Sequence, residues 1–351
     1  MGRIILPRIS VRHLLPPEPE IAVRLQPQHL HWQVGRYKER IVSGSGGLGR
    51  GRLWVPEREG EQHNLILTQT YDTLIGLYGL VDLGRYAVVG TGSAAPSPTQ
   101  TGLVNEIART DADSSPPLSE DTEPTAGQAV LKRVREFTES QVGGRNLTEW
   151  GFSPVGTPGG NLMCRELFRD GSGNPVVLTL APDQRLRLIY SYSFNYEPAI
   201  GTAQDVSINI AGLGVKTAKL FLSRSISRID HVYLLSEWAA NSYDWPNNTF
   251  YGVLASSVTP HPFAGPNTYG STEMLLRVLG TTQITRGRKI KARTFTANEA
   301  NVTWYGLTIA RRFPPNPPAG ALFLAFDPGQ EFTKDSLYKV VVNEWVLTWG
   351  P

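Results

Sequence analysis

A short phrase occurs twice in this chain, and its recurrence constrains the fold more than any other feature. The first copy runs from Phe137-Thr to Trp150-Gly-Phe, and the second runs from Phe295-Thr to Tyr305-Gly-Leu. Each copy continues through Asn-(Leu/Val)-Thr before its aromatic-Gly-apolar ending. A phrase repeated far apart in a sequence predicts one folding unit used twice in tandem. The expected equivalences are Phe137 with Phe295 and Gly151 with Gly306.

Short apolar runs separated by turn residues fill both halves of the chain. Apolar and polar side chains alternate from Leu186 to Phe194, and a matching segment closes the second half from Tyr338 to Trp349. Such alternation is typical of strands with one buried face. The 35 glycines and 26 prolines suit a fold with many turns. We predict an all-β chain with two tandem antiparallel β-sandwich domains, residues 61–200 and 201–351, the second related to the first.

Residues 1–60 predict an extended N-terminal arm that serves assembly. Pro7, Pro16, Pro17, Pro19 and Pro27 argue against long helices and central strands in this segment. Residues 30–37 are compatible with one strand, and the glycine-rich residues 44–51 predict a flexible loop. Such an arm gains order by lying on its own domains or on a neighbouring subunit. We expect it to make few contacts with its own core and many with other chains.

Composition and charge exclude several classes of protein. The net charge of +3 is too small and too dispersed to predict nucleic-acid binding. The single cysteine, Cys164, excludes an intrachain disulfide and a thiolate metal site, and we expect it to be reduced and packed in a strand. No apolar run is long enough to span a membrane, and the N-terminus lacks the pattern of a signal peptide. These features predict synthesis in a reducing cytoplasm.

Motifs that would indicate catalysis or a cofactor are weak. The glycine-rich stretches 44–51 and 90–93 lack the Gly-Lys-(Ser/Thr) that brings a lysine to a phosphate, so a turn or linker is favoured. His29 and His31 have a spacing that could hold a metal, but no third ligand lies nearby in the sequence. No Gly-x-Ser-x-Gly elbow occurs. We therefore expect no catalytic residue, no metal and no cofactor.

An aromatic cluster in the second half is the best candidate for recognition. Its aromatic rings are interleaved with asparagine and aspartate, a combination that suits sugar or protein surfaces. The alternatives are a loop packed on its own domain or buried in a subunit contact, because aromatic residues also dominate oligomer interfaces. We predict an interface with another subunit or a host surface. The cluster comprises Trp238, Tyr243, Trp245, Phe250 and Tyr251.

Several segments together resemble modules of tailed-bacteriophage tail-fibre and baseplate proteins. The resemblance covers residues 64–195 and, more weakly, 280–350, where the Gly-Thr-Gly-Ser segment is missing. It implies a structural role in the virion and carries no catalytic residue. The segments are Asn64-Leu-Ile, Tyr86-Ala-Val-Val-Gly-Thr-Gly-Ser-Ala-Ala-Pro, Thr101-Gly-Leu-Val-Asn-Glu-Ile-Ala-Arg, Asn146-Leu-Thr-Glu-Trp-Gly-Phe, Leu167-Phe-Arg-Asp and Asp183-Gln-Arg-Leu.

From this resemblance we expect a virion structural protein of the tail tip, baseplate or tail-fibre base, made in the cytoplasm of the host bacterium. Its partners would be other copies of itself in a ring or trimer, and other tail proteins. One alternative is a receptor-binding, lectin-like tail protein that recognises a host glycan or protein through the aromatic cluster. A polysaccharide hydrolase is a third, less favoured alternative.

Overall fold

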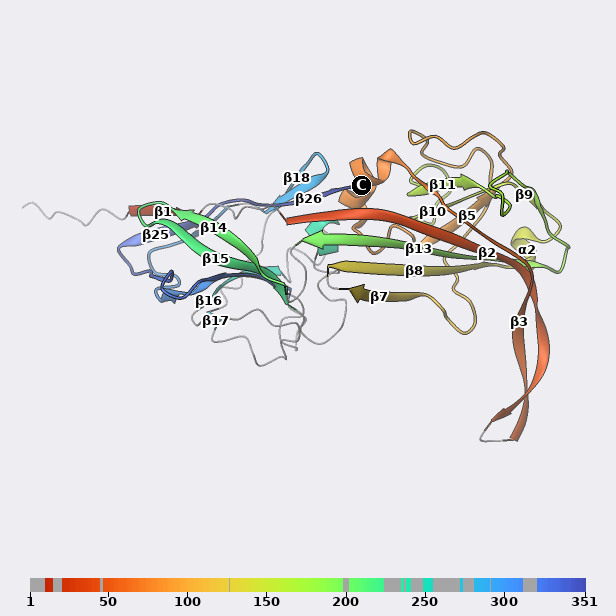
Figure 1. Cartoon of the computed structure of the whole chain (residues 1–351), viewed down its shortest axis with the longest axis horizontal. Helices are drawn as coiled ribbons and strands as arrows, with labels where there is room; N and C mark the ends of the chain where they lie inside the picture. The colour runs from red at the N-terminus through yellow and green to blue at the C-terminus, as the bar shows by residue number, and fades with distance from the viewer. Residues whose placement is uncertain are drawn as a thin grey trace, which may run out of the picture.

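The computed structural model shows an elongated chain built mainly of β-strands, so the predicted all-β class is confirmed (Figure 1). Short helical segments are η1 (Thr70–Leu74), α1 (Ile75–Tyr78) and α2 (Glu139–Val142). The segments η1 and α1 follow a two-residue strand, Leu65–Ile66. The structure describes residues 10–14, 21–44, 47–125, 127–197, 202–223, 235–236, 238–240, 249–254, 272–273, 281–290, 292–311 and 321–351.

An eight-stranded sheet forms the spine of the first half and continues into the second. Its strand order is β18-β19-β26-β2-β13-β8-β7, with β3 paired to β2. The strands are β18 (Thr281–Ile284), β19 (Gly287–Ile290), β26 (Trp345–Gly350), β2 (Ile21–Gly44), β13 (Arg185–Glu197), β8 (Gln128–Phe137), β7 (Glu120–Thr125) and β3 (Gly47–Gln62).

A five-stranded sheet shares a core with this spine. Its order is β4-β11-β10-β5-β6. Phe152 of β10 stacks on Tyr190 of β13 with ring centroids 4.6 Å apart, and Tyr192 and Phe194 continue the column of rings. The alternation from Leu186 to Phe194 therefore buries one face of β13, as the sequence predicts. The strands are β4 (Leu65–Ile66), β11 (Cys164–Leu167), β10 (Glu149–Ser153), β5 (Tyr86–Gly90) and β6 (Glu106–Thr110).

A nine-stranded sheet forms the other end of the molecule (Figure 1). In sheet order its strands are β17 (Thr272–Glu273), β16 (Thr249–Leu254), β22 (Gly306–Arg311), β23 (Ala321–Phe326), β15 (Gly214–Ser223), β14 (Gln204–Ile210), β1 (Ser10–Leu14), β25 (Tyr338–Val342) and β20 (Arg293–Phe295). Two short pairs complete the described strands: β9 (Asn146–Leu147) with β12 (Leu178–Thr179), and β21 (Thr303–Trp304) with β24 (Phe332–Thr333).

Strand pairing crosses the predicted boundary at residue 200 in both directions. The N-terminal strand β1 lies parallel to β25 in the nine-stranded sheet, with Ser10 opposite Tyr338. The C-terminal strand β26 lies parallel to β2, with Ile21 opposite Leu347. The two ends of the chain therefore tie its halves together.

The expectation that residues 1–60 make few contacts with their own core is wrong for much of the arm. Residues 22–35 of β2 pair with β13 along nearly its whole length. Leu30 and Val34 are fully buried, and Trp32 packs edge-on against Phe168. The pairing register of β2 and β13 shifts between Tyr190 and Tyr192, and Pro27 lies opposite Tyr192 at this break. The strand therefore accommodates the proline.

Two further expectations need correction. The predicted flexible loop at 44–51 is mostly strand, because Gly47 begins β3. The predicted final strand is two strands, β25 and β26, which belong to different sheets. A separate turn after Leu167 is closed by a bridge between Arg169 and Pro175, and the flanking strands β11 and β12 pair with β10 and β9.

The repeated phrase occupies matching positions in the two halves. In the first half, Phe137 pairs with Leu186 and Leu147 pairs with Leu178. The two partner residues are therefore eight positions apart in the sequence. In the second half, Phe295 pairs with Val340 and Trp304 pairs with Phe332. These partner residues are also eight positions apart. Strand pairing therefore places Phe137 and Phe295 at matching positions, which supports the predicted equivalence.

The same local turn follows both phenylalanines. The backbone N–H of Thr138 donates to the Gln141 side chain at 2.9 Å, and that of Thr296 donates to Glu299 at 2.8 Å. The backbone N–H of Gln141 also donates to the Thr138 carbonyl, and that of Glu299 donates to the Thr296 carbonyl. The repeated Phe-Thr-x-x-(Gln/Glu) is therefore a capping-box turn after a strand that ends in the core.

The expected equivalence of Gly151 and Gly306 is wrong by two residues. The N–H of Thr148 donates to Gly90 and its carbonyl accepts from Phe168, whereas Tyr305 makes the corresponding bonds with Leu254 and Phe326. Glu149, and not Gly151, therefore matches Gly306. The sequence alignment is shifted because Asn146 follows Phe137 by nine residues whereas Asn301 follows Phe295 by six. Strand pairing requires a difference of only one residue, so aligning the two Asn-x-Thr motifs displaces the glycine by two.

Candidate functional site

The outer part of β2 and β3 forms a two-stranded ribbon that projects from the body of the molecule. We define the ribbon as residues 36–44 of β2 paired with residues 47–55 of β3. Figure 1 shows the ribbon leaving the end of the eight-stranded sheet and pointing away from the five-stranded and nine-stranded sheets. Within the described residues, each of its strands pairs only with the other. The ribbon thus offers unpaired backbone edges, which are natural docking sites for another chain.

Two aromatic rings at the root of the ribbon hold it to the sheet. Tyr37 and Trp54 face each other across the two strands with ring centroids 5.5 Å apart, in an edge-on arrangement. The Arg187 guanidinium of β13 lies 4.3 Å from the Trp54 ring centroid, and Arg185 lies 5.3 Å from that of Tyr37. These cation–π contacts fix the angle at which the ribbon leaves the sheet.

A network of ion pairs surrounds these rings. Glu136 of β8 receives Arg185 at 2.6 Å and Arg187 at 2.8 Å, and the Tyr37 hydroxyl donates to it at 3.0 Å. The hydrogen bond from Arg185 lowers the pKa of Glu139. A hollow of about 460 Å³ lies here, between the ribbon root and residues 112–116.

The sequence analysis did not predict this ribbon or the side chains at its root. The available signal was the glycine-rich segment 44–51 between two short apolar stretches, Ile41-Val42 and Leu53-Trp54-Val55. This pattern is typical of a hairpin.

A second feature is a buried carboxylate that organises the loop between β5 and β6. Glu149 is fully buried, and one of its oxygens accepts hydrogen bonds from the backbone N–H groups of Gly92 and Asn105, each at 2.8 Å. The other accepts from Val104 at 3.1 Å. The Gly-Thr-Gly stretch does bind an anion through its backbone, but the anion is the chain's own carboxylate, which favours the loop interpretation over a phosphate site.

Arg165 of β11 completes this loop clamp. It is also fully buried, and its Nη2 lies 2.9 Å from Glu149 Oε2. Its remaining donors reach Gln100 Oε1 at 2.7 Å and the carbonyl of Ala94 at 2.9 Å. Each buried charge therefore has several partners, which offsets the cost of removing it from water.

The clamp requires its two glycines. A Cβ on Gly92 would lie 2.4 Å from Glu149 Oε1, and a Cβ on Gly90 would lie 2.4 Å from the carbonyl oxygen of Asn105. In the second half the place of Glu149 is taken by Gly306, and Phe323 stands opposite Phe221 with rings stacked at 5.2 Å. An apolar cluster that includes these two rings lies at this position in the second half.

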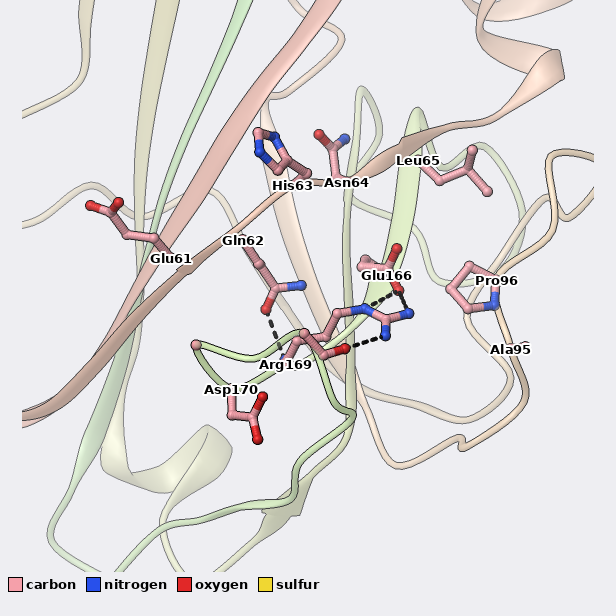
Figure 2. A pocket seen from close by; sticks show the side chains of 12 residues that line it. Glu61, Gln62, His63, Asn64, Leu65, Ala95, Pro96, Glu166, Arg169 and Asp170 are labelled. Atoms are coloured by element: carbon pink, nitrogen blue, oxygen red, sulfur yellow. Dashed lines mark hydrogen bonds and ion pairs between the residues drawn. The ribbon is translucent and has the colours of Figure 1, made fainter.

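An open pocket of about 670 Å³ lies where β3 runs into β4 (Figure 2). Figure 2 shows Arg169 directed toward Glu166, which it reaches at 2.9 Å, while Arg169 Nη1 donates to the Gly173 carbonyl at 2.8 Å. Gln62 accepts from the backbone N–H of Arg169, and His63 and Asn64 stand along one wall. The lining combines charged side chains of both signs with the apolar Leu65, Ala95 and Pro96.

The predicted aromatic cluster is only partly described. Trp238 is 0 % exposed and belongs to the main core, so the expectation that it lines an external surface is wrong. Its segment is held by the neighbouring Ala239 carbonyl, which accepts from Arg288 at 2.7 Å. Phe250 and Tyr251 contribute backbone to β16, but their side chains lie outside the described residues, as do Tyr243 and Trp245 entirely.

The histidines and the cysteine have structural surroundings. His31 lies 3.2 Å from Glu59, and His29 packs edge-on against His63. No group of three potential ligand side chains in the described part of the chain is placed to hold a metal ion. Cys164 is free and buried in β11, and burial raises its pKa to about 12, so its predicted position in strand packing is confirmed.

Comparison with models of protein families, with curated proteins and with solved structures found no match. Across the described residues, no helix has the length and apolar character needed to cross a membrane.

Proposed function

We propose that this chain is a structural protein of a tailed-phage virion, which forms part of the tail tip, baseplate or tail-fibre base by assembling with copies of itself and with other tail proteins. The observation that carries this proposal is the ribbon, residues 36–44 and 47–55. It projects from the sheet, its edges are unpaired within the described residues, and a dedicated aromatic and ionic root holds it at a set angle. An isolated two-stranded ribbon gains little stability by itself, so a partner is the physical reason to maintain one.

We further propose that the chain contains two related sandwich units joined by exchanged terminal strands. The matching pairs β8·β13 and β20·β25, β9·β12 and β21·β24, and the equivalent capping-box turns support a duplication. The segments that resemble tail proteins include the loop clamp around Glu149, whose glycines and buried charges explain why that motif has this form.

Mass spectrometry of purified virions tests the proposed function. The chain should be present in stoichiometric amounts in particles and concentrated in isolated tails. A variant with residues 39–51 replaced by a two-residue turn should fold but fail to enter particles, because the root remains while the docking edges are gone. Absence of the chain from purified virions would refute the structural role.

The receptor-binding alternative is favoured by one observation, the open pocket around Arg169, whose lining mixes apolar and charged side chains. Polar groups of both charges in a hollow of this size suit a saccharide. Virions carrying Arg169→Ala should assemble normally under either proposal. If such virions form but fail to attach to cells, the pocket binds the receptor; if they attach normally, the structural proposal stands alone.

A further inference from the structure

Strand pairing brings a third histidine to the two that the sequence pattern singled out. His29 and His31 lie two residues apart on β2, and the neighbouring sequence offers no further ligand. In the ladder His31 lies opposite Glu61, so His29 lies beside His63, which directly follows β3. The rings of His29 and His63 meet edge-on with their centroids 6.2 Å apart. Two imidazoles from different strands are therefore neighbours.

This pair of rings lies on the solvent-facing side of the β2·β3 ladder. Successive side chains of a strand point to opposite faces. Leu30 and Trp32 are buried in the core, so His29 points outward. Both His29 and His63 are exposed. A metal ion can thus reach the pair from solvent, and the rings can rotate to bind it without disturbing the core.

The same outward face carries His31 and two carboxylates. His31 has a different partner, because its Nε2 lies 3.2 Å from Glu59 Oε2. Glu59 and Glu61 stand opposite Gln33 and His31 in the ladder, so their side chains share the face of the histidines. Negative charge beside the two rings favours a cation over an anion at this place.

The chemistry of two neighbouring imidazoles suits a transition-metal ion. Imidazole nitrogen binds zinc, copper and nickel well, whereas magnesium and calcium prefer oxygen ligands. Side chains opposite each other in a ladder have Cβ atoms about 5 Å apart, which lets both rings reach one ion. An imidazole has two nitrogens, so a ring that keeps a hydrogen bond at one nitrogen can bind a metal through the other.

We propose that His29 and His63 bind one divalent transition-metal ion between them, with water in the remaining coordination positions. The site has two protein ligands, which agrees with the absence of any three-ligand group among the described residues. His63 also lines the open pocket beside β4 (Figure 2), so the side of the ion that carries water is open to solvent. This site goes beyond the proposed virion role and does not depend on it.

Calorimetric titration of the full chain, prepared without a histidine tag, tests the site with Ni²⁺ and with Mg²⁺. The unchanged protein should bind one Ni²⁺ per chain and no Mg²⁺. His29→Ala and His63→Ala should each weaken Ni²⁺ binding by about tenfold or more, because each removes one of two ligands. The double variant should bind little more weakly than either single variant, because the two ligands hold the same ion. Both positions are exposed, and thermal unfolding checks that each variant folds.

His31→Ala is the matched control, since it removes a neighbouring histidine from the same strand and the same face. It should bind Ni²⁺ like the unchanged protein. An unchanged protein that binds no Ni²⁺, or Ni²⁺ binding that survives both single substitutions, overturns the site. A loss on His31→Ala as large as that on His63→Ala also overturns it, because the ligands would then be His29 and His31 of one strand.

Discussion

Glu149 and Arg165 form an ion pair from which solvent is entirely excluded, with Arg165 Nη2 2.9 Å from Glu149 Oε2. Between them they hold the loop of residues 90–105 through backbone donors and a backbone acceptor. The pair joins adjacent strands, β10 and β11, so the loop is fastened to the centre of the five-stranded sheet.

Removing one member of this pair should strongly destabilise the protein. Arg165→Ala leaves a buried carboxylate without its cation, and we expect a loss of about 3–5 kcal/mol in the free energy of unfolding. Urea denaturation measures it. The control is Glu166→Gln, which breaks the more exposed pair with Arg169 and should cost about 1 kcal/mol or less. Equal effects of the two variants would contradict a clamp role.

Gly306 should not tolerate a side chain. Its φ is 155°, and a Cβ there would lie 2.0 Å from the carbonyl oxygen of Leu324 on the paired strand. Gly306→Ala should therefore cost several kcal/mol, more than the roughly 0.5–1 kcal/mol by which alanine and glycine differ in unstrained positions. Gly171→Ala, where no atom lies within 4 Å of the added Cβ, should have stability close to that of the unchanged protein. An unaffected Gly306→Ala would show that β22 and β23 can separate at low cost.

Trp238 should contribute to stability and not to surface binding. Because its side chain is fully buried in the main core, Trp238→Ala should cost about 3–5 kcal/mol. Val215→Ala, at a position 65 % exposed in β15, should change stability by about 0.5 kcal/mol or less. A Trp238→Ala protein that keeps its stability but assembles poorly would restore the interface interpretation. For Trp245, which lies outside the described residues, we predict that Trp245→Ala weakens assembly or adsorption.

Because its thiol is buried, Cys164 should make the folded protein measurably less stable as the pH becomes alkaline. Burial raises the pKa of the folded-state thiol from 9.0 to about 12, so the unfolded chain releases this proton first. The stabilising contribution is complete below pH 9 and declines as the pH rises toward 12. The advantage of the unchanged protein over Cys164→Ala should narrow by up to about 1.4 kcal/mol per pH unit in that range. A constant difference from pH 8 to 11 would contradict the buried, protonated thiol.

The folded protein should also resist thiol reagents. Cys164 is held in β11 between β10 and β4, and the reactive thiolate is disfavoured there. Labelling at pH 8 should proceed only after denaturation. Rapid labelling of the native protein would show that β11 opens.

Local patterns determined the elements whose form depends on neighbouring residues in the chain. The alternation from Leu186 to Phe194 specified β13 and its buried face, because side chains in a strand alternate sides. The repeated Phe-Thr specified a turn, because threonine and the residue three positions later satisfy each other's backbone groups.

Tertiary structure decided which strands meet and which side chains are buried. Nothing near Ser10 specifies that β1 pairs with β25, and nothing near Val342 separates β25 from β26 into different sheets, because strand partners are chosen by long-range burial. The same limitation placed Gly306 opposite Gly151 in the alignment, although strand pairing matches it to Glu149. An aromatic side chain such as Trp238 suits a core and an interface equally, and only the packing of residues distant in sequence distinguishes them.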